Sequence, residues 1–173
     1  MDLRKYIKYA LPHIVVETLR HDPQNIEKSK YLTDLTVREM YALLAVLMEL
    51  EREVNDPSYL EIGIFKGGTL KFLKNHTKHT TFTGIDYFED FVPEDGNTHV
   101  CETFPVKTVM DYVGRDRVTL IKGDSAQVLP ELKKSQTHFD MIFIDGNHKY
   151  GAVKRDFDNS LEIIKKGWIH CLS

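Results

Sequence analysis

Residues 58–70 of the chain, SYLEIGIFKGGTL, decide the fold. In the first half of this stretch apolar side chains alternate with small or polar ones, which is the period of a β-strand. The chain then reaches Gly63, and Gly67 and Gly68 follow together. Glycine adopts backbone angles that other residues avoid and lets another group approach the backbone closely. The stretch therefore predicts a strand that turns sharply into a helix, with a close approach at the turn.

Strand and helix patterns alternate from this segment to the end of the sequence. Strands are predicted at 58–63, 80–86, 117–122, 139–145 and 168–172. Helical patterns separate them at 69–76, 106–113, 125–134 and 150–164. Strands that alternate with helices are joined by right-handed crossovers, which gives a parallel sheet with helices on both faces. The sequence therefore predicts a doubly wound, mostly parallel α/β fold of about five strands.

The part of the chain before this segment carries a helical pattern instead. Its apolar side chains keep a helical spacing, which Pro12 divides into two short helices. Thr36 and Glu39 have the spacing of a capping box, which predicts the start of a further helix. We predict a helical arm over residues 1–54 that packs on an α/β core over residues 55–173, the two forming one structural domain.

The composition is that of a soluble protein without a nucleic-acid signature. The 173 residues carry a formal net charge of -3 and no basic stripe, so we expect no nucleic-acid partner. No apolar run approaches the length of a membrane span, and the first residues lack the apolar centre of a signal peptide. Cys101 and Cys171 are far apart and lack metal-ligand spacing, which favours a reducing compartment. We therefore predict a cytoplasmic protein that binds no membrane.

The predicted strands end in acids and glycines. In doubly wound sheets ligands bind beyond the carboxyl ends of the strands, near the point where the strand order reverses. The residues at those ends are, in chain order, Gly63, Asp86, Asp124 with Ser125, and Asp145 with His148. A carboxylate at the end of the second strand is where a ribose diol is held. The pattern therefore predicts a nucleoside-like ligand.

The glycine spacing argues against a dinucleotide. The loop reads G-x-x-x-G-G rather than G-x-G-x-x-G, and Phe65 stands where the second glycine would admit a pyrophosphate. A ring at that position suits a nucleoside whose other end is compact and not strongly anionic. A nicotinamide-dependent oxidoreductase is therefore disfavoured.

Four motifs stand in order at the predicted strand ends: EIGIFKGGT at 61–69, GID at 84–86, GDSA at 123–126 and FIDGNHKY at 143–150. Together they resemble class I S-adenosylmethionine-dependent methyltransferases, in particular small O-methyltransferase-like proteins with an I-D-G-x-H-x-Y motif. The resemblance runs from about residue 36 to residue 166. It implies a Rossmann-like core, S-adenosylmethionine as the cofactor, S-adenosylhomocysteine (SAH) as the product, and a small-molecule acceptor.

The resemblance also implies which residues bind the cofactor: Glu61, Gly63, Ile64, Phe65, Gly67, Thr69, Asp86, Tyr87, Asp124, Ser125 and Asp145. In this interpretation Gly63, Phe65 and Gly67 form a turn under the methionine part, so that the close approach at the turn is to the cofactor. Glu61 is expected to hold the glycine turn, or nearby backbone N–H groups, from beneath.

The other implied contacts follow the cofactor from one end to the other. Thr69 would bind the methionine carboxylate, and Asp86 would bind the ribose hydroxyls. Asp124 and Ser125 would flank the adenine. The catalytic residues implied are Asp145, facing the methyl-transfer site, and His148, at its rim with Tyr150.

Each of these residues also has a structural explanation that the sequence leaves open. The glycines could serve only a tight turn, and Asp86 could be a helix cap or a solvated acid. Ser125 could be the N-cap of the following helix and still contact the adenine. His148 could be a general base or could cap the helix that begins near residue 150. The acidic, aromatic loop at 86–96 could cover the adenosine or lie in solvent.

The end of the sequence departs from the family pattern. Related O-methyltransferases continue after the fifth strand with two further strands, and many carry an acid pair there that helps to hold a divalent metal. The corresponding stretch ends here at Ser173, so we expect a C-terminally shortened sheet and no metal held by protein carboxylates. The strand at 168–172 would then be an apolar edge, which a homodimer or the N-terminal helices would cover.

We therefore predict an S-adenosylmethionine-dependent methyltransferase that acts on an oxygen of a small-molecule or sugar-like acceptor. Its catalysis would consist mainly of aligning the acceptor and removing its proton. The alternative is a catalytically impaired binding module or subunit, which keeps the cofactor site but lacks part of the acceptor side.

Overall fold

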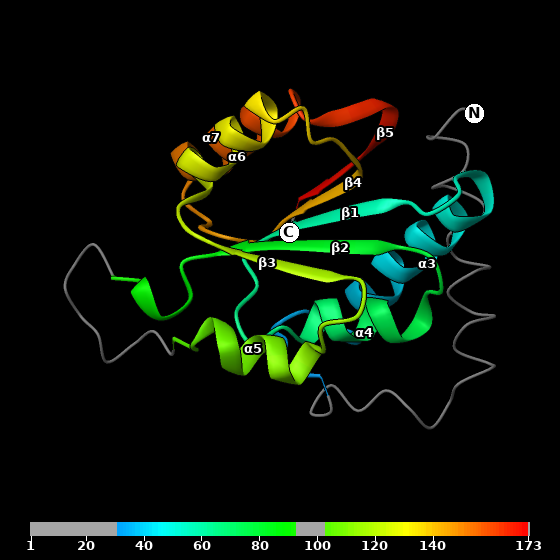
Figure 1. Ribbon diagram of the computed structural model, residues 1–173, viewed down its shortest axis with the longest axis horizontal. Helices are drawn as coiled ribbons and strands as arrows, with labels where there is room; N and C mark the ends of the chain where they lie inside the picture. Colours follow the sequence, from blue (N-terminus) through cyan, green and yellow to red (C-terminus); the bar gives the residue numbers. More distant parts are fainter. Residues whose placement is uncertain (1–30, 93–102, 173) are drawn as a thin grey trace.

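Five parallel strands form one sheet in the computed structural model, which describes residues 31–92 and 103–172. The strands are β1 (Ser58–Ile62), β2 (Thr81–Asp86), β3 (Val118–Lys122), β4 (Phe139–Ile144) and β5 (Ile164–Leu172). They lie in the order β3-β2-β1-β4-β5, with β1 at the centre (Figure 1). The order reverses between β1 and β4, and folds of this kind bind ligands beyond the carboxyl ends of the strands at such a point.

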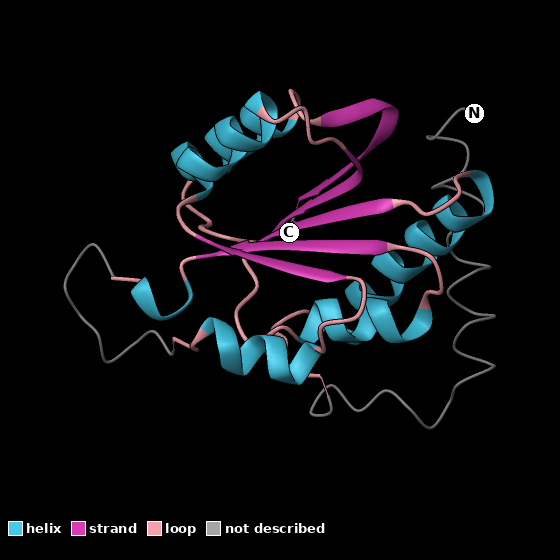
Figure 2. Ribbon diagram, viewed as in Figure 1, coloured by secondary structure: helices cyan, strands magenta, loops and turns pink. Residues whose placement is uncertain are grey.

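Helices cover both faces of this sheet (Figure 2). One face carries α3 (Val37–Glu53), α4 (Gly68–His76) and α5 (Val106–Val113), and the other carries α6 (Ser125–Lys134) and α7 (Tyr150–Ser160). A short 3₁₀ helix, η2 (Phe88–Asp90), follows β2. The predicted doubly wound α/β fold is confirmed. Within residues 31–92 and 103–172, no helix is both long and apolar enough to cross a membrane.

The sheet is held between two apolar layers. On the first face, the fully buried residues Tyr41, Phe72 and Phe82 join side chains from α3, α4 and β2 in one cluster. On the second face, Leu129 of α6 and Ile142 of β4 belong to a smaller cluster. Every residue of β4 is buried, as expected for a central strand of a sheet covered on both sides.

The helix before the glycine segment begins where the sequence predicts. Thr36 caps α3, and the Glu39 side chain reaches back to the Thr36 backbone, which completes the capping box. Met40, Leu44 and Leu47 of this helix are fully buried in the first apolar layer. The division at residue 54 stays a prediction, and the two helices predicted before residue 20 lie outside the described residues.

The fifth strand begins earlier than the sequence pattern indicates. The pattern predicts a helix to residue 164 and a strand from residue 168, whereas α7 ends at Ser160 and β5 starts at Ile164. Between them Leu161 is half exposed while Ile163 is fully buried, so an apolar spacing that looks helical continues through a turn. β5 is the last strand in the sheet order. A homodimer through this edge stays a prediction.

Glu51 fastens the end of α3 to the loop that leads into β2. Its carboxylate accepts hydrogen bonds from the backbone N–H groups of Lys78, His79 and Thr80 at 2.7–3.2 Å, and from the Thr80 hydroxyl at 2.7 Å. Burial raises the pKa of Glu51, but these hydrogen bonds outweigh it, and the pKa lies below the usual 4.5. The ionised carboxylate is therefore the form that the fold stabilises.

We expect Glu51→Gln to lower the free energy of unfolding at neutral pH by about 1–2 kcal/mol, because an amide accepts these bonds more weakly than a carboxylate. Since the folded-state pKa of Glu51 is lowered, its contribution is present above pH 4.5 and is lost as the pH falls through the folded value. Urea unfolding of both proteins at several pH values measures the difference. Glu49→Gln, which removes an exposed ion pair with Arg52 on the same helix, is the control and should cost under about 1 kcal/mol.

Candidate functional site

A cavity of about 1680 Å³ opens beyond the carboxyl ends of the sheet. Most of the predicted site residues line it: Glu61, Gly63, Ile64, Phe65, Thr69, Asp86, Tyr87, Asp124, Ser125, Asp145 and His148. Gly67 and Tyr150 do not. The strand ends therefore gather the predicted residues in one place, as the parallel arrangement requires.

Asp86, at the end of β2, holds the turn that follows β1. One carboxylate oxygen, Oδ2, accepts the backbone N–H groups of Ile64 at 2.6 Å and Phe65 at 3.0 Å. The other, Oδ1, accepts the N–H of Phe88 at 3.1 Å. Phe65 and Phe88 have φ values of +51° and +52°, which bulky residues rarely adopt. The carboxylate therefore fixes two unusual backbone conformations at once.

The sequence interpretation gave that task to Glu61, and this is wrong. Glu61 is 1% exposed, and its Oε2 accepts a hydrogen bond from the Tyr59 hydroxyl at 3.0 Å. Burial raises the pKa of Glu61 well above its usual value, the Tyr59 hydrogen bond opposes this, and the charges of Asp145 and Asp86 raise it further. Glu61 is thus a carboxyl group of the cavity wall that strongly favours its neutral form.

The glycines of the turn lie against protein. A Cβ on Gly63, whose φ is +92°, would stand 2.3 Å from the Asp145 carbonyl oxygen. A Cβ on Gly67 would meet the side chains of Val113 and Val109 in α5, at 2.6 and 2.9 Å. The space that a side chain would occupy at these two glycines is therefore filled by protein, and a close approach of the cofactor to the turn stays a prediction. Gly63 still lines the cavity, and Gly67 packs the turn onto α5.

The segment before α3 forms a wall that the sequence did not reveal. The N–H of Gly68 donates to the Leu32 carbonyl at 3.1 Å, and a Cβ on Gly68 would stand 2.4 Å from that backbone. The hydroxyl groups of Thr33 and Thr69 are 2.9 Å apart, and Thr69 is 4% exposed. Thr33 and Asp34 both line the cavity. No local pattern marks them, because they reach the site through a contact with α4.

Asp124 and Ser125 begin α6 at another part of the cavity. Asp124 is the N-cap, since its carboxylate accepts the N–H of Ala126 at 2.9 Å, and Ser125 is the first helical residue. The alternative that Ser125 is the N-cap is therefore wrong. Ser125 instead donates its hydroxyl to Oδ1 of Asp156 at 2.7 Å.

Two residues of α7 belong to the same region and were not predicted. Asp156 is 3% exposed, and burial raises its pKa. Its neighbour Arg155 lies 3.9 Å from the carboxylates of Asp124 and Asp156.

Tyr87, which follows β2, also contacts Asp124. Burial, together with a hydrogen bond to Asp124, raises the pKa of Tyr87 to about 12. These groups form a polar network around the start of α6.

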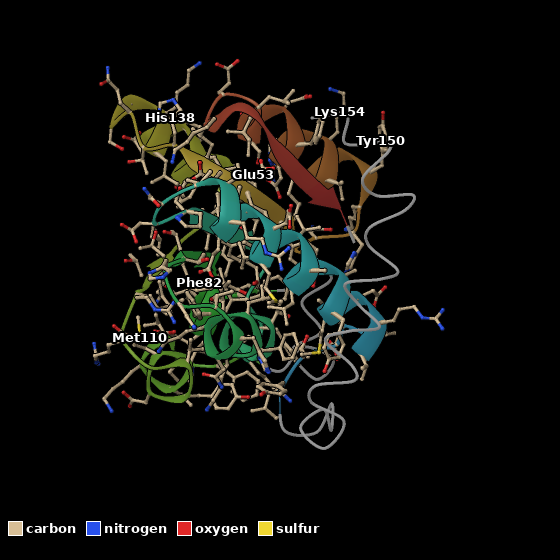
Figure 3. The ribbon with its side chains drawn as sticks, turned by 90° about the vertical axis from the view of Figure 1, so that its right-hand side faces the viewer. Glu53, Phe82, Met110, His138, Tyr150 and Lys154 are labelled. Carbon is tan, nitrogen blue, oxygen red and sulfur yellow. The ribbon has the colours of Figure 1, made fainter. Side chains whose placement is uncertain are left out.

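The backbone after β4 carries the predicted catalytic residues. The Asp145 N–H donates to the Ile62 carbonyl at 2.8 Å, which holds this segment against the end of β1. His148 is exposed at the cavity, and it does not cap α7: the N-cap is Lys149, whose N–H donates to Asn147 Oδ1 at 2.9 Å. Tyr150 is 81% exposed on the side of α7 that also carries Lys154 (Figure 3), and it is not among the residues that line the cavity.

Aromatic side chains stand at the mouth of the cavity. Phe65 packs edge-on against Phe104, with ring centroids 6.0 Å apart, and the Lys66 ammonium lies 4.8 and 4.9 Å from the two centroids. Tyr87 and Phe91 pack similarly at 5.9 Å. In the loop at 86–96, all described residues from Asp86 to Val92 except Glu89 line the cavity; the remaining residues of the loop lie outside the described part.

The acids of the site do not form a metal centre by themselves. Among the side chains that the structure describes, those of residues 31–92 and 103–165, no group of three or more His, Cys, Asp or Glu is arranged to hold a metal ion. The arrangement offers carboxylates as hydrogen-bond acceptors and aromatic rings as packing surfaces, which suits an organic ligand with hydroxyl and amino donors.

Residues 60–171 match the sequence model of a protein family described as the methyltransferase domain. The chain belongs to this family. The chain is also 29% identical over 146 residues to the uncharacterized protein R132 of Acanthamoeba polyphaga mimivirus, a match that covers 82% of this chain and 63% of the viral protein. The chain thus spans less than two thirds of the length of this curated relative.

Solved structures agree with the fold. The MycE methyltransferase from the mycinamycin biosynthetic pathway, solved with Mg and SAH, has a TM-score of 0.53 at 20% identity, over 73% of this chain and 29% of that protein. CalS11, a TDP-rhamnose 3'-O-methyltransferase of calicheamicin biosynthesis, has a TM-score of 0.56 at 15% identity, over 99% and 78% of the two chains. At such identities the likeness establishes the fold of the methyltransferase domain.

We expect Gly63→Ala to destabilise the methyltransferase domain by at least about 2 kcal/mol without any ligand present, because the new Cβ meets backbone and the φ value is unfavourable. Gly151→Ala is the control: it lies near the start of α7 with nothing within 4 Å of the added Cβ. That substitution should be neutral or stabilising by up to about 1 kcal/mol. Urea unfolding compares the two; equal stabilities would contradict the contact between the ends of β1 and β4.

Proposed function

We propose that this methyltransferase domain binds S-adenosylmethionine in the cavity and transfers the methyl group to an oxygen of a small-molecule acceptor. The observation that carries the proposal is the set of carboxyl groups from three successive strand ends, Asp86, Asp124 and Asp145, in one cavity of a chain that belongs to this family. The presence of SAH in a solved methyltransferase of the same fold supports the choice of cofactor.

The residues of the cavity fit such a ligand. A carboxylate offers about four acceptor positions, and the described backbone uses three at Asp86, which leaves room for a ribose hydroxyl. The rings of Tyr87 and Phe91 and the network at Asp124 offer a surface and acceptors for an adenine. Cavities for drug-sized ligands measure roughly 300–1,000 Å³, so the volume of about 1680 Å³ accommodates an acceptor as well.

The cofactor supplies, when bound, a methyl group on a positively charged sulfur. The protein must place the acceptor oxygen in line with the methyl–sulfur bond and take up the proton that the hydroxyl loses as the new carbon–oxygen bond forms. His148 is exposed at the cavity on the segment that follows β4, close in sequence to Asp145. An imidazole takes up a proton near neutral pH, so we assign His148 as the base and Asp145 as the residue that orients the acceptor.

Titration with SAH and with NAD tests the proposal. We expect calorimetry to show binding of SAH alone, and labelled S-adenosylmethionine to yield product with a hydroxylated acceptor from a small library. NAD binding without SAH binding would overturn the proposal. The alternative of a catalytically impaired binding module finds no support among the described residues or the matches; it requires SAH binding with no product from any acceptor.

Asp86→Asn tests the double role of this carboxylate. Asparagine keeps one accepting oxygen, but its amide nitrogen cannot accept the backbone N–H on the other side, so we expect a loss of stability of about 1–3 kcal/mol and a loss of SAH binding free energy of about 1.5–3 kcal/mol. Thermal unfolding and calorimetry measure the two effects. Asp158→Asn, an exposed acid paired with Lys154 on α7, should change neither. Unchanged SAH affinity in a folded Asp86→Asn protein would remove Asp86 from the ligand site.

His148→Ala tests the assignment of the base. Once an acceptor is known, we expect kcat to fall by about 10²–10⁴-fold, while SAH affinity stays the same because His148 is not among the predicted cofactor contacts. Steady-state kinetics and calorimetry separate these effects. Tyr150→Phe, two residues further on and largely exposed, is the matched control and should keep full activity. Full activity of His148→Ala would transfer the role of base to Asp145.

A further inference from the structure

The segment that follows β2 forms one wall of the cavity. Tyr87, Phe91 and Val92 of this segment line the cavity with exposed side chains. The regular structure within the segment is η2, a 3₁₀ helix of three residues, whose closing backbone bond from Phe91 to Phe88 is 3.3 Å long. A helix this short gains little from its own hydrogen bonds, so contacts with the rest of the protein must keep it in place.

Lys122, the last residue of β3, makes two of these contacts. Its ammonium lies 2.8 Å from one carboxylate oxygen of Glu89 and 2.8 Å from a carboxylate oxygen of Asp90. The other oxygen of Glu89 accepts the N–H of Val106, the first residue of α5, at 2.9 Å. One ammonium therefore joins the end of β3 to η2 and, through Glu89, to the start of α5.

The two acids depend on this ammonium to stay together. Because Glu89 and Asp90 both approach the same point, their negative charges repel each other once the cation is removed. A single exposed ion pair contributes little, whereas charges that form a network with good geometry contribute more. Here one cation, two carboxylates and a backbone N–H form such a network.

The network lies behind the wall rather than in the cavity. Neither Lys122 nor Glu89 lines the cavity, whereas Tyr87 and Phe91, on either side of η2, do. The rings of Tyr87 and Phe91 pack against each other at 5.9 Å, and the Tyr87 hydroxyl is bonded to Asp124 at the start of α6. The ring pair is therefore held from one side by Asp124 and from behind by Lys122.

We propose that Lys122 is a positioning residue for the ligand: through Glu89 and Asp90 it sets the place at which the rings of Tyr87 and Phe91 meet the adenine. The proposal rests on the proposed function, in which these rings pack against the adenine. Because Lys122 lies outside the cavity, its loss changes the wall that the ligand meets and removes no contact with the ligand itself.

Calorimetry of the full chain with SAH tests this role. Lys122→Met keeps the apolar length of the side chain without its charge, and we expect it to weaken SAH binding about three- to tenfold. Lys122→Arg should restore the affinity to within about twofold, because a guanidinium also bonds two carboxylates. Lys133→Met, which removes an exposed ion pair with Glu162, is the matched control and should leave the affinity unchanged. Circular dichroism establishes that each variant is folded at the temperature of the titration.

Salt provides a second measurement. SAH carries one ammonium and one carboxylate near neutral pH and so has no net charge, whereas salt screens exposed ion pairs such as those of Lys122. We expect the difference in SAH affinity between the unmodified protein and Lys122→Met to shrink to less than about twofold as NaCl rises from about 0.05 to 1 M.

Unchanged SAH affinity in Lys122→Met, or an equal loss in Lys122→Arg, would overturn the inference and leave the proposed function standing. If Lys122→Met does not fold, Glu89→Gln replaces it, because its amide oxygen still accepts the Val106 N–H while the charge is gone. That variant should weaken SAH at least about twofold, and unchanged affinity would again overturn the inference. Failure of the unmodified protein to bind SAH would overturn the inference and the proposed function together.

Discussion

The carboxylate of Asp86 is the interaction on which the site depends. It ties the end of β2 to the turn after β1 through the N–H groups of Ile64 and Phe65, and it also fixes its own following turn at Phe88. Two bulky residues with positive φ cost about 1–3 kcal/mol each, and hydrogen bonds to a charged acceptor offset such costs. This carboxylate therefore adds side-chain bonds to the backbone bonds that hold the turn between β1 and α4.

The fold follows from the sequence because its determinants are local. Alternation within each strand, a helical period between strands, and an acid or glycine at each strand end give the parallel sheet and its ligand edge. The one shifted boundary, at Ile164, arises where buried apolar residues continue through a turn and imitate a helix. The gathering of Asp86, Asp124 and Asp145 at one cavity follows from parallel topology alone.

The roles of individual side chains could not be read in the same way. The sequence shows that Glu61 and Asp86 both stand near strand ends, but a difference in burial decides which of them receives the backbone N–H groups. The sequence left Ser125 open as the N-cap of α6, whereas the N-cap is Asp124, one residue earlier. Thr33 and Asp156 reach the cavity by contacts between distant parts of the chain, and such contacts leave no trace in local spacing.

Residues 31–34, which supply Thr33 and Asp34 to the cavity wall, precede β1 in the sequence. The strand-end residues of the cavity all follow them. This segment is joined to the core by the Leu32 carbonyl, the Thr33 hydroxyl and the packing of Gly68, and by Tyr31, which is buried against Phe72. Substitutions at Thr33 or Asp34 would therefore change one side of the cavity without replacing any strand-end residue, whereas Tyr31 belongs to the core. One wall of the cavity can thus differ in sequence while the strand-end residues opposite it stay the same.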